Sequence, residues 1–206
     1  MRNKLNNLIR KIKLNKIKEF KKIDGFLSEN EAIGLFDLSK SLSKNSNILE
    51  IGSWKGKSTL CLAKGLKKGF VYIIDPFNAD GESESKDIYL NTIGKLSLEQ
   101  QFKINLERSN LFNKIKVCKG YSADFIDLSV QFSLIFIDGD HSIEGCEFDF
   151  LNFNKKLSKS GYLVFHDYYP ERLQLGPTYV INKYILNNEN WQVLKIIDSL
   201  FIAKKI

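Results

Sequence analysis

The sequence of 206 residues predicts a doubly wound α/β fold with a mostly parallel, seven-stranded sheet. Five times along the chain, a short apolar run of strand length is followed by a segment with helical periodicity, which is the pattern of βαβ units. Two further apolar runs near the C-terminus are separated only by Asp198-Ser199, which predicts an antiparallel β-hairpin at the sheet edge. With 43% apolar residues, a chain of this length can bury a substantial core.

The predicted elements follow in order along the chain. Residues 1–24 have the pattern of a basic amphipathic helix, and residues 28–42 that of a helix with a capping box, since Glu31 stands three residues after Ser28. The five parallel strands are expected at residues 47–51, 70–74, 114–118, 132–137 and 162–165. Helices are expected at residues 57–67, 98–108, 123–128, 143–157 and 178–186. The hairpin pairs 191–197 with 200–203, and a polar insertion at 78–87 is a candidate lid.

The basic character of the chain is concentrated at its N-terminus. The net charge is +7, and residues 1–22 alone carry nine basic side chains against one acid, so the remainder is close to neutral. Six apolar residues of this segment share about a third of the helical wheel: Leu5, Leu8, Ile9, Ile12, Phe20 and Ile23. Such a helix can dock on its own or a neighbouring subunit, lie on an anionic membrane, or bind nucleic acid. We expect the 25–206 body to form the catalytic domain and not to bind nucleic acid.

The composition also predicts the cellular compartment of the protein. The longest apolar runs are strand-sized, far below the roughly 20 residues of a membrane span. The N-terminus lacks the apolar core and cleavage site of a secretory signal. Cys61, Cys118 and Cys146 are odd in number and lack metal-ligand spacing. We therefore expect a cytoplasmic protein with reduced thiols.

The first strand-to-helix turn carries the pattern Glu50-x-Gly52-x-x-x-Gly56. A Walker phosphate loop needs four residues between its first glycine and its Gly-Lys pair, and here only three separate the two glycines. The dinucleotide fingerprint also fails, because Trp54 occupies the position of its second glycine. The turn therefore either binds a cofactor without a phosphate to cradle or is a purely structural tight turn.

This turn resembles the first motif of class I S-adenosylmethionine (SAM)-dependent methyltransferases, which have a Rossmann-like sheet. The resemblance implies SAM as the cofactor, with these residues of the turn in contact with it: Glu50, Gly52, Ser53, Gly56 and Ser58. Asp75 ends the second strand about 20 residues further on, where an acid can accept hydrogen bonds from ribose hydroxyls, although it could also be a turn residue. Ser122 follows the third strand, where the family contacts the adenine ring.

Only two histidines occur in the chain, and both follow predicted strands beside carboxylates. Asp138-Gly139-Asp140-His141 follows the fourth strand, and His166-Asp167 follows the fifth. Because ligands of open α/β sheets lie beyond the carboxyl ends of the strands, these five titratable groups predict a reaction centre. Each one alone could instead be a helix cap or a hydrogen-bonded structural side chain.

Together these two segments resemble the small methyltransferases related to macrocin O-methyltransferase and to cephalosporin-hydroxylase-like proteins. The resemblance implies that Asp138, His166 and Asp167 bind a divalent cation, Mg²⁺ or Mn²⁺, and that Asp138 also lies near SAM. His166 departs from the acid common in relatives, and imidazole suits Mn²⁺ better than Mg²⁺. Asp140 or His141 would be the base, with His141 preferred because an unperturbed imidazole titrates near pH 6.5.

The activity implied is methyl transfer to a hydroxyl of a sugar, glycan or small metabolite. Two alternatives remain open at this point. One is an RNA methyltransferase that uses the basic N-terminal segment as a phosphate clamp. The other is a non-catalytic module that binds a membrane or protein partner through residues 1–22. The sequence leaves open whether the chain forms a homo-oligomer.

Overall fold

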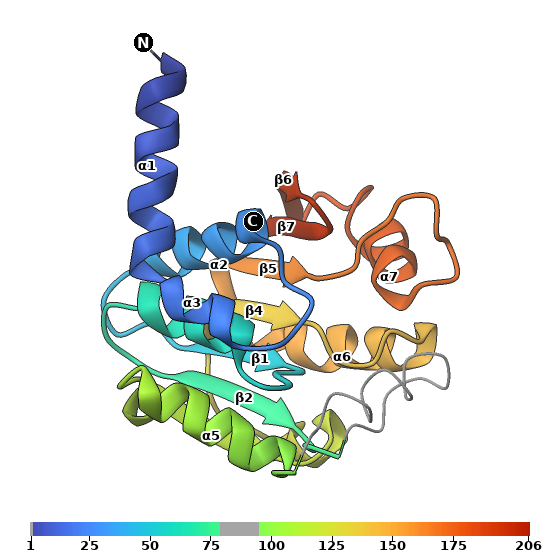
Figure 1. The fold of residues 1–206 in the computed structure, drawn as a ribbon. Helices are drawn as coiled ribbons and strands as arrows, with labels where there is room; N and C mark the ends of the chain where they lie inside the picture. The colour runs from blue at the N-terminus through green and yellow to red at the C-terminus, as the bar shows by residue number, and fades with distance from the viewer. Residues whose placement is uncertain (1, 79–94) are drawn as a thin grey trace.

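The computed structural model describes residues 2–78 and 95–206, which form a seven-stranded sheet in the order β3-β2-β1-β4-β5-β7-β6 (Figure 1). The strands are β1 (Ile48–Ile51), β2 (Val71–Asp75), β3 (Ile115–Lys119), β4 (Phe132–Ile137), β5 (Leu157–Phe165), β6 (Trp191–Ile197) and β7 (Leu200–Lys205). The first five are parallel, and β7 runs antiparallel to both β5 and β6. The predicted fold class is confirmed. The candidate lid at 78–87 lies outside the described residues except for Asn78.

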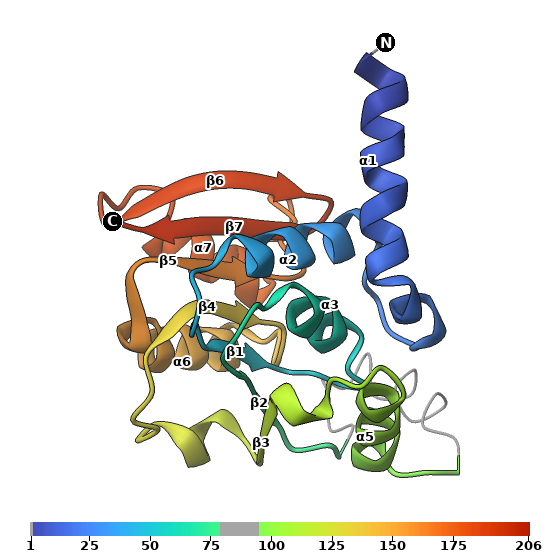
Figure 2. The same ribbon diagram turned by 90° about the vertical axis from the view of Figure 1, so that its left-hand side faces the viewer.

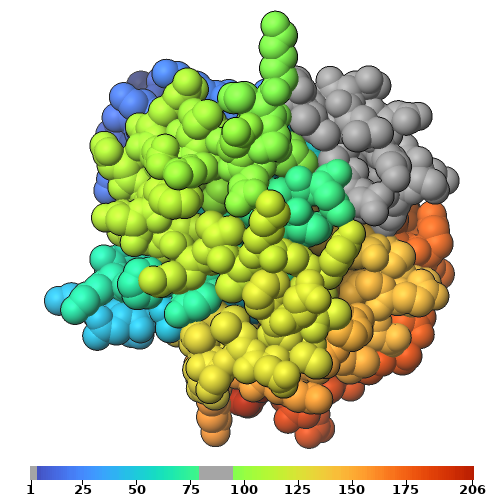
Figure 3. All heavy atoms as spheres, turned by 90° about the horizontal axis from the view of Figure 1, so that it is seen from below, coloured from blue at the N-terminus to red at the C-terminus, as the bar shows by residue number. Residues whose placement is uncertain are grey.

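Helices cover both faces of this sheet, as Figures 1 and 2 show. On one face lie α2 (Glu29–Ser41), α3 (Lys57–Gly65) and α5 (Leu98–Arg108), and on the other lie α6 (Ile143–Phe153) and α7 (Gly176–Tyr184). Short 3₁₀ segments are η1 (Lys18–Lys22), η2 (Phe112–Lys114), η3 (Ser122–Phe125) and η4 (Asn154–Lys156). The face seen from below is formed largely by the segment from α5 to β4, with the α6 region beside it (Figure 3).

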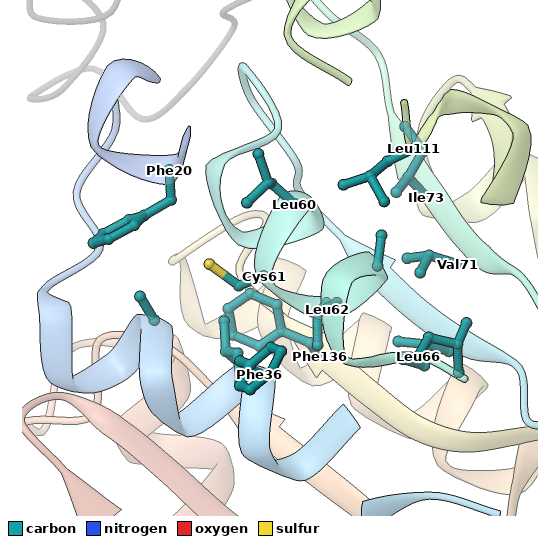
Figure 4. Packing of buried hydrophobic residues seen from close by; sticks show 14 of the residues in the cluster. Phe20, Phe36, Leu60, Cys61, Leu62, Leu66, Val71, Ile73, Leu111 and Phe136 are labelled. Atoms are coloured by element: carbon teal, nitrogen blue, oxygen red, sulfur yellow. The ribbon is translucent and has the colours of Figure 1, made fainter. Parts of the chain in front are cut away.

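The core is divided into two clusters by the sheet. Because successive strand residues point to opposite faces, Leu134 and Phe136 of β4 pack towards α2 and α3, whereas Ile135 and Ile137 pack towards α6 and α7. Figure 4 shows Phe136 in the first cluster, gathered with side chains of α2 and α3. Burial on both faces explains why residues 134–137 of β4 are all apolar.

The predicted helix over residues 1–24 is interrupted. The helix α1 ends at Lys16, and η1 follows it. Ile17, Phe20 and Ile23 are buried in the first core cluster, whereas the earlier apolar residues of the predicted stripe are exposed. The later apolar residues of this segment therefore belong to the core, whereas the earlier ones belong to the solvent-exposed surface of α1. None of the described helices is long and apolar enough to cross a membrane.

Two predicted boundaries are wrong near β5. The predicted helix 143–157 ends at Phe153, where the carbonyl of Phe150 accepts hydrogen bonds from both the backbone and the side-chain amide of Asn154, and η4 follows. Strand β5 then begins at Leu157 and not at 162, with a register shift against β4 and a positive φ of 63° at Ser160. Residues 159–161 form this bulge within the strand. Their sequence, Lys-Ser-Gly, has the composition of a loop, so the sequence predicts a strand that begins after them.

Candidate functional site

A cavity of about 1220 Å³ lies at the carboxyl ends of β1, β2, β4 and β5. Ten of the predicted site residues line it: Gly52, Ser53, Ser58, Asp75, Ser122, Asp138, Asp140, His141, His166 and Asp167. Glu50 and Gly56 do not line it. The structure therefore brings the glycine turn and the two histidine segments to one site, as the topology of parallel strands predicts.

The two glycines of the turn have different neighbours. Both have a positive φ, 81° at Gly52 and 87° at Gly56. A Cβ on Gly52 would lie 2.1 Å from the carbonyl oxygen of Asp138, so this glycine lets the turn approach the end of β4. A Cβ on Gly56 would lie 2.4 Å from a methyl carbon of Leu106 and 3.0 Å from the ring of Phe102. Gly56 therefore permits α3 to pack on α5, and its expected cofactor contact stays a prediction.

Glu50 is fully buried beneath the turn and does not reach the cavity. Its two carboxylate oxygens accept hydrogen bonds from the hydroxyls of Ser58 and Thr59 at the start of α3. Burial raises the pKa of Glu50 to about 8, although both hydroxyl hydrogen bonds oppose that rise. The residue thus links β1 to α3, and its contact with a cofactor stays a prediction.

Asp75 holds the glycine turn in place. Its Oδ2 accepts hydrogen bonds from the backbone amides of Ser53 at 2.7 Å and Trp54 at 2.8 Å. Its Oδ1 accepts from the backbone amide of Phe77 at 2.7 Å. Asp75 also lines the cavity, so binding of ribose hydroxyls stays a prediction for the same carboxylate.

Asp138, His141 and Asp167 form a group that could hold a metal ion. One ligand atom from each can be chosen so that all lie within 4.8 Å of one another. Nε2 of His141 lies 3.2 Å from Oδ2 of Asp167 and 3.7 Å from Oδ1 of Asp138. That buried nitrogen has no hydrogen-bond partner of acceptable geometry among the described residues. An unsatisfied imidazole nitrogen facing two carboxylates is a donor set that suits Mn²⁺, Fe²⁺ or Zn²⁺.

His166 is more deeply buried than His141 and lies behind this group. Its Nδ1 is 3.1 Å from Oδ1 of Asp138 and 3.3 Å from Oδ2 of Asp167. Its Nε2 points away, 3.5 Å from Oε2 of Glu31. Glu31 was expected only in a capping box, which it does form, so its approach to His166 was missed. The group that could hold a metal ion thus includes His141, and metal binding by His166 stays a prediction.

The two imidazoles are strongly affected by the carboxylates. Burial lowers the pKa of His141, but the nearby carboxylates of Asp138 and Asp167 favour the charged imidazolium, outweigh burial and raise that pKa to about 10. The pKa of His166 is raised well above its usual range against the same burial effect. The preference for His141 as base assumed an unperturbed imidazole, and the arrangement of the carboxylates removes that basis.

Two further acids lie on the cavity wall. The exposed carboxylate of Asp140 accepts a hydrogen bond from the amide of Ser142 at 2.8 Å, so it forms a local turn before α6. Asp149 is buried, and burial raises its pKa to about 7, against a hydrogen bond from Ser122. Asp149 was not among the predicted site residues. In the sequence, Asp149 could have been found as an acid inside a predicted helix, directly before the apolar and buried Phe150.

Comparison with known proteins gives three kinds of match. Residues 49–168 match the model of the Methyltransf_24 family, which is described as a methyltransferase domain. The uncharacterized protein R132 of Acanthamoeba polyphaga mimivirus is 28% identical over 158 residues, or 73% of this chain. The alignment spans 65% of the length of that curated relative.

Two solved structures illustrate the shared fold. The O-methyltransferase TomG from Streptomyces achromogenes, in complex with SAM, has a TM-score of 0.64 at 16% identity, and the match covers 95% of this chain and 88% of TomG. An O-methyltransferase from Bacillus cereus, in complex with S-adenosylhomocysteine (SAH), has a TM-score of 0.63 at 18% identity. This match covers 93% of this chain and 91% of that enzyme. At these identities the likeness establishes the fold.

Proposed function

The chain belongs to the Methyltransf_24 methyltransferase family, and we propose that it transfers the methyl group of SAM to a hydroxyl of a sugar or small metabolite with a divalent cation bound. The family and the shared fold confirm the predicted class, a SAM-dependent methyltransferase. Transfer to oxygen, the cation and the acceptor class belong to the proposal. The observation that carries it is the grouping of Asp138, His141 and Asp167 in the same cavity as the glycine turn.

The cavity has room for both substrates. Pockets for one drug-sized ligand usually measure about 300–1,000 Å³, and this one measures about 1220 Å³. The glycine turn, Asp75 and Ser122 line one part of it, and the strand ends of β4 and β5 line another. We assign SAM to the first part and the acceptor hydroxyl to the second.

The residues of the site have separate tasks in this reaction. Asp138, His141 and Asp167 would hold a dication, which lowers the pKa of a bound hydroxyl and fixes its oxygen. SAM, when bound, would supply the methyl group, which the acceptor oxygen would take as the bond from the methyl carbon to the sulfonium sulfur breaks. Asp140, exposed in the cavity, accepts the hydroxyl proton. His166, held between two carboxylates and Glu31, orients Asp138 and Asp167.

The test measures release of SAH from SAM with a panel of monosaccharides, nucleotide sugars and phenols, before and after chelation. We expect turnover with a hydroxyl acceptor that chelation abolishes and Mn²⁺ restores. Asp138→Asn should abolish turnover and leave SAH affinity within about threefold. Asp127→Asn, at an exposed acid outside the cavity, is the matched control and should keep full activity. Chelation-resistant turnover would remove the cation from the proposal, and turnover only on RNA would replace the acceptor class.

A further inference from the structure

The helix α1 presents two faces of opposite character. Its inward face is formed by Arg10, Lys13 and Leu14, which follow the spacing of one helix face and contact the body. Arg10 donates to Glu29 at 2.7 Å, and Lys13 donates to Asp37 at 2.6 Å. Leu14 packs against the first core cluster. These contacts fix which side of the helix faces the protein.

The outward face is a stripe of four aliphatic side chains. Leu5, Leu8, Ile9 and Ile12 have the i, i+3, i+4, i+7 spacing of one helix face, about 145° around the helix from the inward face. They are 57%, 54%, 41% and 50% exposed, respectively. Figures 1 and 2 show α1 projecting beyond α2, with no other element of the described chain along most of its length. The stripe is therefore a continuous apolar surface.

Basic side chains lie beside this stripe. Lys4, Lys11 and Lys16 are exposed, and none of them forms an ion pair with an acid within the described residues. The first acid of the chain is Glu19, beyond the end of α1. An aliphatic stripe bordered by lysines is the composition of helices that lie in the headgroup region of an anionic bilayer.

We propose that α1 binds peripherally to an anionic lipid bilayer. The helix lies in the plane of the membrane, with Leu5, Leu8, Ile9 and Ile12 in the boundary between headgroups and acyl chains. The lysines beside the stripe contact anionic headgroups. The inward face stays on the body through its contacts with Glu29 and Asp37, so the bound helix does not have to detach.

The charge of α1 disfavours two other occupants. A second copy of this helix would bring the lysines beside the stripe, Lys4, Lys11 and Lys16, close to an identical set with no acid of α1 to offset them. Nucleic acid would be held by the lysines alone, because an aliphatic stripe has no role in a phosphate contact. Neither occupant uses both the stripe and its border, whereas an anionic bilayer uses both.

Membrane binding would also place the cavity near the lipid surface. Asp24 and Phe26 follow η1 closely and line the cavity. Lys55 of the glycine turn holds Asp24 in an ion pair of 2.9 Å. The segment that joins α1 to the body is thus part of the site, and an acceptor presented at the bilayer lies within reach of it. This consequence rests on the proposed function, but lipid binding itself does not.

The test is co-sedimentation of the full chain with vesicles of 30% phosphatidylserine and 70% phosphatidylcholine, and with pure phosphatidylcholine. We expect binding to the anionic vesicles only. Lys4→Gln with Lys11→Gln should weaken it about 30-fold, since each basic residue near such a surface contributes a factor of about five. Leu8→Ser with Ile12→Ser should weaken it more than about 10-fold with the charge unchanged.

Matched controls and competing outcomes complete the design. Lys44→Gln with Lys68→Gln, and Leu186→Ser, change exposed residues elsewhere and should bind as the wild type does. SAH affinity measured on each variant checks its fold, because the stripe lies outside the cavity. No binding to anionic vesicles overturns the proposal. So does a wild-type dimer that the Leu8/Ile12 variant converts to a monomer, or tighter binding of a 20-nucleotide RNA that depends on the lysines alone.

Discussion

Replacing Gly56 by alanine separates packing from cofactor binding in the glycine turn. Gly56 has a φ of 87°, and its absent Cβ would lie 2.4 Å from a methyl carbon of Leu106. The residue does not line the cavity. The substitution should therefore destabilise the fold while leaving the cofactor surface unchanged in the molecules that remain folded.

The expected cost has three contributions. A left-handed backbone costs alanine about 1–2 kcal/mol relative to glycine. Overpacking against Leu106 and Phe102 costs about 1–3 kcal/mol. The smaller conformational freedom of alanine in the unfolded chain returns about 0.4–1 kcal/mol. The net loss in the free energy of unfolding is about 1–5 kcal/mol, or roughly 2–20 °C in Tm for a chain of this size.

Urea unfolding and calorimetric titration with SAH measure the two effects separately. We expect a lower urea midpoint with an unchanged slope, and an SAH Kd within about threefold of the wild type. Gly52→Ala is the matched variant, since its Cβ would meet the backbone of Asp138 at 2.1 Å within the cavity wall, and it should lose SAH binding. Wild-type stability in Gly56→Ala together with a large loss of SAH affinity would refute the packing role.

Two other predictions follow from buried groups. The pKa of Glu50 is about 8 in the folded chain against an ordinary 4.5, so the folded state holds a proton that the unfolded state releases. The free energy of unfolding should therefore fall by on the order of 4 kcal/mol as the pH rises from 4.5 to 8. Glu50→Gln should lack this slope in urea titrations, and parallel pH profiles of the two proteins would contradict the prediction. Phe20→Ala should cost about 3–5 kcal/mol because its ring is buried, whereas the exposed Leu8→Ala should change stability by less than about 0.5 kcal/mol. Equal effects of the two would show that η1 is not part of the core.

The sequence predicts the boundaries of a helix or strand well where neighbouring residues in the chain determine them. The Ser28 and Glu31 capping box sets the start of α2 within four residues of chain, and both of its hydrogen bonds form. The boundaries of β4 are also correct, because five of its six residues are apolar, with only Ser133 polar, and polar residues stand on both sides of the strand. By contrast, the start of β5 depends on pairing of Leu157 with Phe132 across the sheet, which no local pattern in residues 157–161 indicates.

The candidate site also combines features that the sequence predicts with features that depend on contacts between distant residues. That Asp138, His141, His166 and Asp167 lie together follows from the strand order, which brings the ends of β4 and β5 side by side. Which imidazole faces the carboxylates with an unsatisfied nitrogen depends on side-chain rotamers and on Glu31, an acid more than 100 residues away in sequence. For the same reason, sequence could not show that Glu50 points beneath the turn and not into the cavity.

The central claim is a divalent cation held by Asp138, His141 and Asp167 beside the cofactor, and anomalous diffraction tests it most directly. Crystals soaked with Mn²⁺ and SAH should give one anomalous peak within about 2.0–2.3 Å of an oxygen from each aspartate and of Nε2 of His141. His166 should remain outside the coordination sphere, against Glu31. An anomalous map without a peak at this position, or with a peak coordinated by His166, would contradict the account.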